Sequence, residues 1–480
     1  MNLFFCPQFK YVENALNNGK EIFFPTEFLH GLNDGGHGAA LDDQWKFMMS
    51  KPLSAGAFLW VFADEGVVRH DLNDSIDTDG NRAPDGILGP FHEKEGSFYT
   101  VKEIWSPVRM KDFKITSEFT GKIPVTNTYL YTNLNLCKFS FELVRFGNSL
   151  GDNVVRKPGI IAAPDIAPGH DGFLVPDLPS DWKSYDAFYI TAIDQYGRLI
   201  NTWSWNITSP QEFSARIVRP GDKKVQATEN ADFMKVSSGT SEFMFDRKNG
   251  SLVGVRNNGQ NISFLAGNMF TGIKRNITAI KSYYDRNDYV IEAQYDSASY
   301  VTWRVKDDGW LQLDFGYGLN GSYEYAGVTF SYPEKYVTGA RLIADGPYHV
   351  WKNRLKGTQF GIYDKKYNDA VTGQRWEYPE FKGYYANLYA TEIQTTEQPI
   401  TIVSPTQGLF LHLFTPAKAG NLKGVRGEVS PNFPSGNISL LHGITAIGTK
   451  FSRADQEGPQ GQKNRFNGTY RGTVYFRFGK

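Results

Sequence analysis

The sequence predicts a mostly β, multidomain protein whose first part alternates strands with helices. Its length of 480 residues corresponds to about three domains at roughly 100 to 200 residues each. Two strand–loop–helix units occupy the first part, and short hydrophobic runs separated by Gly, Asn and Pro fill the rest. We therefore divide the chain into residues 1–106, 107–208 and 209–480.

Residues 1–106 have the pattern of a (β/α) barrel. The apolar run at 22–24 predicts a buried strand, residues 41–49 predict the following helix, and the apolar run at 56–62 predicts the next strand. Polar residues just beyond a buried barrel strand face the mouth of the barrel. Glu27 and the polar, glycine-rich loop that follows it, which holds His30, Asn33, Asp34 and His37, are therefore predicted to face a substrate.

Two polar clusters in this part raise the question of a metal site. His37, Asp42 and Asp43 have ligand chemistry, but Asp42 and Asp43 are more simply the N-cap and first turn of the helix that ends at Met49. The Asp- and Asn-rich segment 71–81 lacks the ligand order of an EF-hand. We predict helix capping for the first cluster and a turn-rich loop for the second.

Residues 107–208 predict an antiparallel β-sandwich, because short alternating runs recur without a helical period. In one of them Phe139, Phe141 and Leu143 alternate with Ser140 and Glu142, which is typical of a half-buried strand. The expected strands are 113–119, 125–130, 139–146, 186–192 and 199–205.

Residues 209–480 predict a polar linker with one strand at 214–218, followed by a larger all-β region. Within it, 241–252 reads as a hairpin, because Asn249-Gly250 supplies the two turn positions that tolerate positive φ. Further strands are expected at 299–305, 311–317 and 328–332.

Composition narrows the function classes. The 51 basic and 51 acidic residues balance, which argues against a nucleic-acid partner. Cys6 and Cys137 fall in different predicted domains, so no disulfide framework is expected. The opening residues lack a charged segment and a long apolar core, so we expect neither a signal peptide at this position nor a membrane partner. The compartment, bacterial cytoplasm or periplasm, stays open.

Residues 6–107 resemble the C-terminal end of the catalytic barrel in family 2 glycoside hydrolases, the beta-galactosidase family. The matching features are Glu27 followed by Phe28, His30 and a glycine-rich loop, the strand Gly56 to Trp60, and more loosely Asp85-Gly86-Ile87, where the family has Asn. The middle part resembles the family's immunoglobulin-like β-sandwich. The last part resembles its mutarotase-like β-supersandwich, on residues 245–250, 345–354 and 378–380.

The resemblance implies hydrolysis of terminal β-galactosidic bonds in oligo- or polysaccharides by a retaining double displacement. Glu27 would be the nucleophile that attacks the anomeric carbon. His30 would hydrogen-bond a sugar hydroxyl, Trp60 would stack on the galactosyl ring, and Asp85 would bind substrate. On position alone, His30 also fits a loop brace and Trp60 a core residue.

The acid/base residue of that mechanism is missing. A retaining glycosidase needs two carboxyl groups about 5 to 5.5 Å apart, and in the family the acid/base follows an asparagine well upstream of the nucleophile. Only 26 residues precede Glu27, and none forms an Asn-Glu pair at a strand end. We therefore expect this chain to be the C-terminal part of a longer enzyme. The alternative is a catalytically incomplete fragment that acts as a carbohydrate-binding or structural β-sandwich protein.

The same resemblance bears on ligands and assembly. Family enzymes often need Mg²⁺ or Na⁺, but most of those ligands would lie upstream, so no cofactor is expected in this chain. The expected partner is a carbohydrate, and a homo-oligomer stays open. A glucuronide would call for a basic contact. Since residues 27–37 contain no Arg or Lys, a neutral sugar is favoured.

Overall fold

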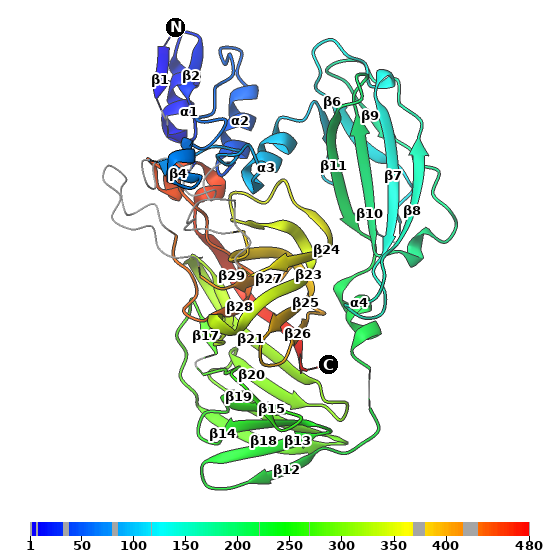
Figure 1. The fold of residues 1–480 in the computed structure, drawn as a ribbon, viewed down its shortest axis with the longest axis vertical. Helices are drawn as coiled ribbons and strands as arrows, with labels where there is room; N and C mark the ends of the chain where they lie inside the picture. The colour runs from blue at the N-terminus through cyan, green and yellow to red at the C-terminus, as the bar shows by residue number, and fades with distance from the viewer. Residues whose placement is uncertain are drawn as a thin grey trace.

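The computed structural model describes residues 2–5, 8–31, 38–78, 85–116, 118–219, 221–267, 269–367, 380–415 and 431–479. Cys6, Asn33, Asp34 and His37 lie outside the described residues, as do residues 79–81 and 378–379 of the ranges named above. Strands predominate and are distributed over several sheets, which confirms the mostly β prediction. In Figure 1 the helical N-terminal part lies at the top, a pair of small sheets lies beside it, and the large sheet lies below.

The N-terminal part places short parallel segments side by side. Strand β1 pairs with β2 in parallel, residues 54–59 lie parallel to β2 through bridges at Ser54 and Leu59, and Ala63 bridges Leu88 in parallel. The predicted strand at 56–62 is thus present only as isolated bridges. The elements are β1 (Asn2–Phe5), α1 (Phe9–Asn18), β2 (Phe23–Glu27), α2 (Leu41–Met49) and α3 (Gly96–Ile104).

Helices and strands of this part share one hydrophobic core. Val12 and Leu16 of α1, Phe23 of β2, Met48 of α2 and Val101 of α3 are all buried in it. A hairpin of β3 (Gly66–Arg69) and β4 (Ser75–Thr78) lies in the segment that connects Ala63 to Leu88. It replaces part of the turn-rich loop that was predicted for residues 71–81.

Two antiparallel sheets follow and enclose a common core. Phe139, Phe141 and Leu143 are buried there, as their alternation predicted. One sheet has the order β5-β6-β9 and the other β11-β10-β7-β8. Their bounds are β5 (Val108–Met110), β6 (Ile123–Asn127), β7 (Lys138–Arg145), β8 (Val155–Ile161), β9 (Asp171–Leu174), β10 (Ala187–Ile193) and β11 (Leu199–Asn206).

Two predicted strands in this region are wrong. Residues 113–119 contain no strand among their described positions. Their aromatic rings pack on other rings instead, Phe113 on Trp205 with 4.6 Å between centroids and Phe119 on Trp182 with 5.7 Å. Residues 214–218 belong to helix α4 (Pro210–Ile217) and its C-cap.

Helix α4 forms because its first turn satisfies its own backbone. The Ser209 hydroxyl accepts a hydrogen bond from the Glu212 N–H at 3.2 Å, and the Glu212 carboxylate accepts one from the Ser209 N–H at 2.9 Å. Pro210 occupies the first helical position, where its missing N–H has no cost. These local signals outweigh the strand-like alternation of the residues that follow.

The rest of the chain forms a five-stranded and a 13-stranded sheet that share the largest core. The predicted hairpin is confirmed as β14 and β15. The smaller sheet holds β12 (Gln226–Glu229), β13 (Phe233–Ser238), β14 (Ser241–Asp246), β15 (Leu252–Asn257) and β16 (Gln260–Ile262). The larger holds β17 (Phe270–Thr271), β18 (Ala279–Asp285), β19 (Asp288–Gln294), β20 (Tyr300–Val305), β21 (Leu311–Tyr323), β22 (Ala326–Phe330), β23 (Val337–Val350), β24 (Gln359–Lys366), β25 (Gly383–Thr395), β26 (Ile400–Val403), β27 (Phe410–Leu413), β28 (Ile438–Gly443) and β29 (Asn464–Phe478).

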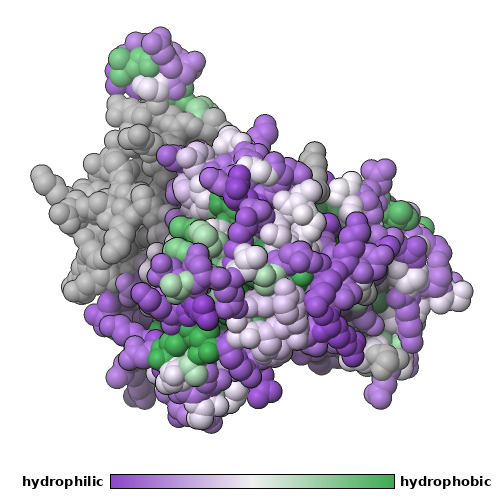
Figure 2. Space-filling model, turned by 90° about the horizontal axis from the view of Figure 1, so that it is seen from below, coloured by the Kyte–Doolittle hydropathy of each residue, from purple (hydrophilic) through white to green (hydrophobic). Residues whose placement is uncertain are grey.

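Hydrophilic side chains cover most of the described surface seen from below, and hydrophobic side chains gather there in small separate patches (Figure 2). Every helix in the described part of the chain is too short or too polar to cross a membrane. Cys137 is buried as a free thiol.

Candidate functional site

The candidate site begins where β2 ends. Glu27 is the last residue of β2, and Leu29 adopts a left-handed backbone conformation with φ of 51°. This turn brings the His30 ring back to Glu27, and His30 Nε2 lies 3.1 Å from Glu27 Oε2. The His30 side chain is 4% exposed, whereas that of Glu27 is 26% exposed. The carboxylate therefore faces solvent while the imidazole beside it is buried.

Asp85 lies on the other side of the same ring. Its Oδ2 is 3.1 Å from His30 Nδ1, and its side chain is 1% exposed. The backbone holds Asp85 in place, because its carbonyl accepts a hydrogen bond from the Val61 N–H at 2.9 Å. Glu27, His30 and Asp85 thus form one hydrogen-bonded chain, although 55 residues separate His30 from Asp85.

Two aromatic rings enclose His30. Trp60 stacks on it with 5.8 Å between ring centroids and 22° between planes, and Phe451 meets it edge-on at 4.9 Å. The four residues singled out in the sequence, Glu27, His30, Trp60 and Asp85, therefore lie together. Their roles in binding and catalysis stay predictions.

Lys450 completes the cluster and had escaped sequence reasoning. Its Nζ is 2.7 Å from Asp85 Oδ2, and its side chain is 10% exposed. It comes from a segment 365 residues further along the chain, so no local motif connects it to Asp85. A buried ammonium paired with a buried carboxylate needs its partner, because either charge alone would be strongly destabilising.

The hydrogen-bond geometry fixes how many protons the cluster holds. Ionised carboxylates only accept hydrogen bonds, and a neutral imidazole has a single N–H. His30 faces a carboxylate oxygen at both ring nitrogens. For both contacts to be hydrogen bonds, either His30 carries two protons or one of the two carboxyl groups carries one. The contact between Glu27 and His30 thus includes a proton that can lie on either group.

Asp64 adds a further acidic group behind Asp85. Burial raises the pKa of Asp64 to about 7, against the hydrogen bond that its Oδ1 accepts from the Gly86 N–H, and the charges of Asp85 and Glu93 act in the same direction as burial. The side of the cluster away from Glu27 is therefore acidic and shielded from water, and Lys450 supplies positive charge there.

Asp42 and Asp43 both lie in the first turn of α2, as predicted, but neither of them is its N-cap. The N-cap is Ala40, which has a positive φ of 65°, and both aspartates lie in the first helical turn. They hold the C-terminal part of the chain instead: Asp42 Oδ2 accepts from Gln460 Nε2 at 2.9 Å, and Asp43 Oδ2 accepts from the Gln460 N–H at 2.7 Å. Within the described ranges, no three His, Cys, Asp or Glu side chains are grouped to hold a metal ion.

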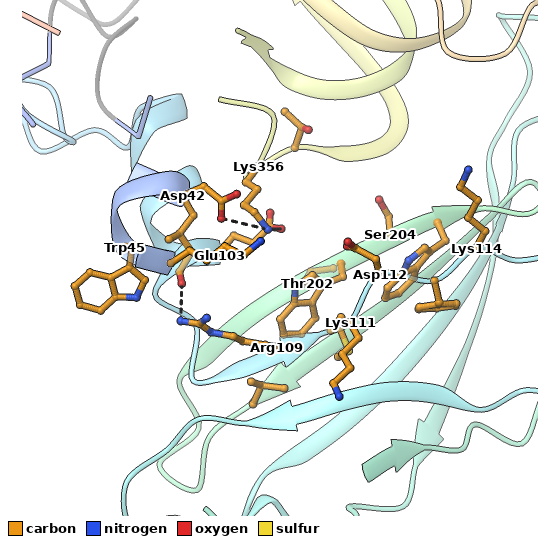
Figure 3. A pocket seen from close by; sticks show the side chains of 18 residues that line it. Asp42, Trp45, Glu103, Arg109, Lys111, Asp112, Lys114, Thr202, Ser204 and Lys356 are labelled. Carbon is orange, nitrogen blue, oxygen red and sulfur yellow. Dashed lines mark hydrogen bonds and ion pairs between the residues drawn. The ribbon is translucent and has the colours of Figure 1, made fainter. Parts of the chain in front are cut away.

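A separate hollow of about 750 Å³ lies between α2, α3 and the neighbouring sandwich (Figure 3). Lys356 spans one wall, with Nζ 3.9 Å from Asp42 Oδ1 and 3.9 Å from Glu103 Oε1. Burial raises the pKa of Glu103, while the charge of Lys356 opposes that rise. Glu27 does not line this hollow. It marks a polar junction between parts of the molecule, distinct from the candidate site.

The comparisons with known proteins do not identify a family. No known family profile matches the sequence, and no curated protein matches it. Similar solved structures include a galactose 1-epimerase from Lactobacillus acidophilus (8% identity, 54% of this chain and 100% of that chain, TM-score 0.29). A protein assigned as a mutarotase from Salmonella typhimurium (9%, 55% and 96%, 0.28) and a β-D-mannosidase from Dictyoglomus thermophilum (12%, 55% and 25%, 0.17) are also similar. Likenesses this weak carry no argument about activity.

Proposed function

We propose that this chain carries the nucleophile of a retaining β-glycosidase of the beta-galactosidase type, and that Glu27 is that nucleophile. The observation that supports the proposal is the hydrogen-bonded chain Glu27–His30–Asp85–Lys450, which leads from a solvent-facing carboxylate to a buried ion pair. The sequence resemblance supplies the reaction class, and the geometry supplies a reason why Glu27 suits it.

The chemistry follows from the two oxygens of Glu27. Oε2 is held by His30 Nε2, whereas Oε1 has no hydrogen-bond partner among the described residues. When the shared proton lies on Nε2, it is donated to Oε2, and Oε1 of the carboxylate attacks the anomeric carbon. The bond from Oε1 to carbon forms as the glycosidic C–O bond breaks, and the leaving oxygen takes that electron pair.

The chain's own residues account for the nucleophilic half of the reaction. Asp85 is unsuited to protonate the leaving group, because it is buried behind His30 and paired with Lys450. Proton donation typically contributes about 10² to 10⁴-fold to the rate. A substrate whose leaving group departs as a stable anion removes the need for that proton, so the first half-reaction can be tested on this chain alone.

The test is release of 2,4-dinitrophenolate from 2,4-dinitrophenyl β-galactoside in stopped flow, with peptide mass spectrometry of the quenched protein. The wild type is expected to release dinitrophenolate and to carry a galactosyl ester on Glu27. Glu27→Gln should lose both signals, whereas the control Glu65→Gln, at an exposed residue of the same part, should keep both. Equal release by wild type and Glu27→Gln would overturn the proposal, and sugar binding without release would favour the binding alternative.

A further inference from the structure

Lys450 reaches the candidate site from a turn that is itself fixed. The Thr449 N–H donates to the Ser452 carbonyl at 2.9 Å, and the Thr449 hydroxyl accepts from the Ser452 N–H at 3.2 Å. Phe451 of the same turn packs on His30, and the Lys450 N–H lies 3.4 Å from the His30 carbonyl oxygen. The turn thus contacts His30 directly through the Phe451 ring and the Lys450 backbone N–H, and indirectly through the Lys450 ammonium, which pairs with Asp85.

We infer that Lys450 is a positioning residue for Glu27: its ammonium holds Asp85 ionised, and ionised Asp85 keeps a proton on His30 Nδ1 and so fixes the ring against Glu27. The inference rests on the proposed function for its catalytic meaning. It assigns a part in the chemistry to the C-terminal β region, which sequence reasoning treated as a separate domain.

The charges around His30 explain why Lys450 matters. Among the described residues, the titratable groups that face the ring include Glu27 from β2 and Asp85 from the adjoining segment, with Asp64 behind Asp85 and the positive charge of Lys450 beside it. Without Lys450, Asp85 would lose this positive charge and remain a buried carboxylate beside a second buried acid. Loss of an opposite charge at a buried site favours the protonated carboxyl group. The proton of the Asp85–His30 bond would then move from Nδ1 to Asp85.

The experiment is ¹⁵N NMR of histidine-labelled full-length protein, with the His30 signals assigned from a His30→Gln spectrum. In the wild type at pH 7, Nδ1 of His30 should show a bound proton. Lys450→Met should lose that signature, because the proton of the Asp85–His30 bond would then lie on Asp85. The control Lys463→Met removes a surface pair with Glu324, at 3.2 Å in the same β region, and should match the wild type.

Lys450→Arg keeps the charge and is the second variant if Lys450→Met does not fold. Folded Lys450→Arg with the wild-type Nδ1 signature supports the inference, and loss of that signature overturns it. Unchanged His30 signals in folded Lys450→Met also overturn it. The NMR measurement does not depend on turnover. A failure of the proposed function would be seen as equal dinitrophenolate release by wild type and Glu27→Gln, and it is therefore distinguishable from a failure of this inference.

Discussion

Replacing Glu457 with glutamine should make the protein less sensitive to alkaline pH. Glu457 is 2% exposed, and its Oε2 accepts a hydrogen bond from Gln44 Nε2 of α2 at 2.7 Å. Burial raises the pKa of Glu457 from 4.5 to about 7, against the hydrogen bonds that it accepts. The folded state thus favours the neutral carboxyl group more than the unfolded state does. A glutamine side chain at this position would keep an acceptor for Gln44 and carry no charge.

The magnitude follows from the two pKa values. Stability from this group is fully present below pH 4.5, falls as pH rises, and reaches its low plateau above pH 7. Between pH 5 and pH 8, the wild type should lose about 2 to 3 kcal/mol of its free energy of unfolding through this residue, since each unit of pKa difference corresponds to about 1.36 kcal/mol. The variant should not show this loss.

The assay is urea unfolding followed by tryptophan fluorescence at pH 5 and pH 8. The free energy of unfolding of Glu457→Gln, taken relative to wild type, should rise by about 2 to 3 kcal/mol between the two pH values. The control Glu118→Gln changes an exposed carboxylate in the loop before β6. Its free energy of unfolding should differ from that of the wild type by the same amount at pH 5 and pH 8. A constant difference between Glu457→Gln and wild type would refute the reasoning, because it would mean that Glu457 titrates alike in both states.

Three further outcomes are expected. Gly357→Ala should lower the free energy of unfolding by more than about 2 kcal/mol, because Gly357 has φ of +89° and a Cβ there would lie 2.4 Å from the Thr100 backbone nitrogen. The control is Gly408→Ala, where φ is +74° and nothing lies within 4 Å of the added Cβ. Thermal melting should show a smaller loss of stability for the control than for Gly357→Ala. Ser209→Ala should lower the free energy of unfolding by about 1 kcal/mol in urea titrations, and a loss below a few tenths would contradict the capping role. The pKa of the Cys137 thiol is raised by burial, so peptide mapping after iodoacetamide at pH 8 should find Cys137 modified only in unfolded protein.

The sequence predicted the elements whose causes are local. The bounds of α2 match the helix expected at residues 41–49, and Asn249-Gly250 marked the hairpin of β14 and β15. The helix α4 was missed although Ser209, Pro210 and Glu212 form a recognisable N-terminal signal. The alternation of residues 214–218 predicts a strand, whereas the capping residues before them carry the opposite and stronger signal.

The residues of the candidate site also divide into those that local patterns predicted and those that only the fold brings together. Glu27 and His30 were found because they are three residues apart on one strand end, and Trp60 and Asp85 were found through a family pattern. Lys450 and Phe451 were missed because the contact that defines them exists only after two distant regions fold together. Charge pairing over 365 residues leaves no trace in composition or spacing.

The pairing of β21 with β29 has a consequence for how the chain reaches its fold. Residues 311–323 align with 464–476 along the whole ladder, so about 140 intervening residues must be made before it closes. Until then, β21 has only β20 beside it and presents an open edge of thirteen residues. Such an edge can accept a strand from another molecule. Because closure of this kind is non-local and therefore slow, the edge stays open to such pairing while the rest of the chain is made.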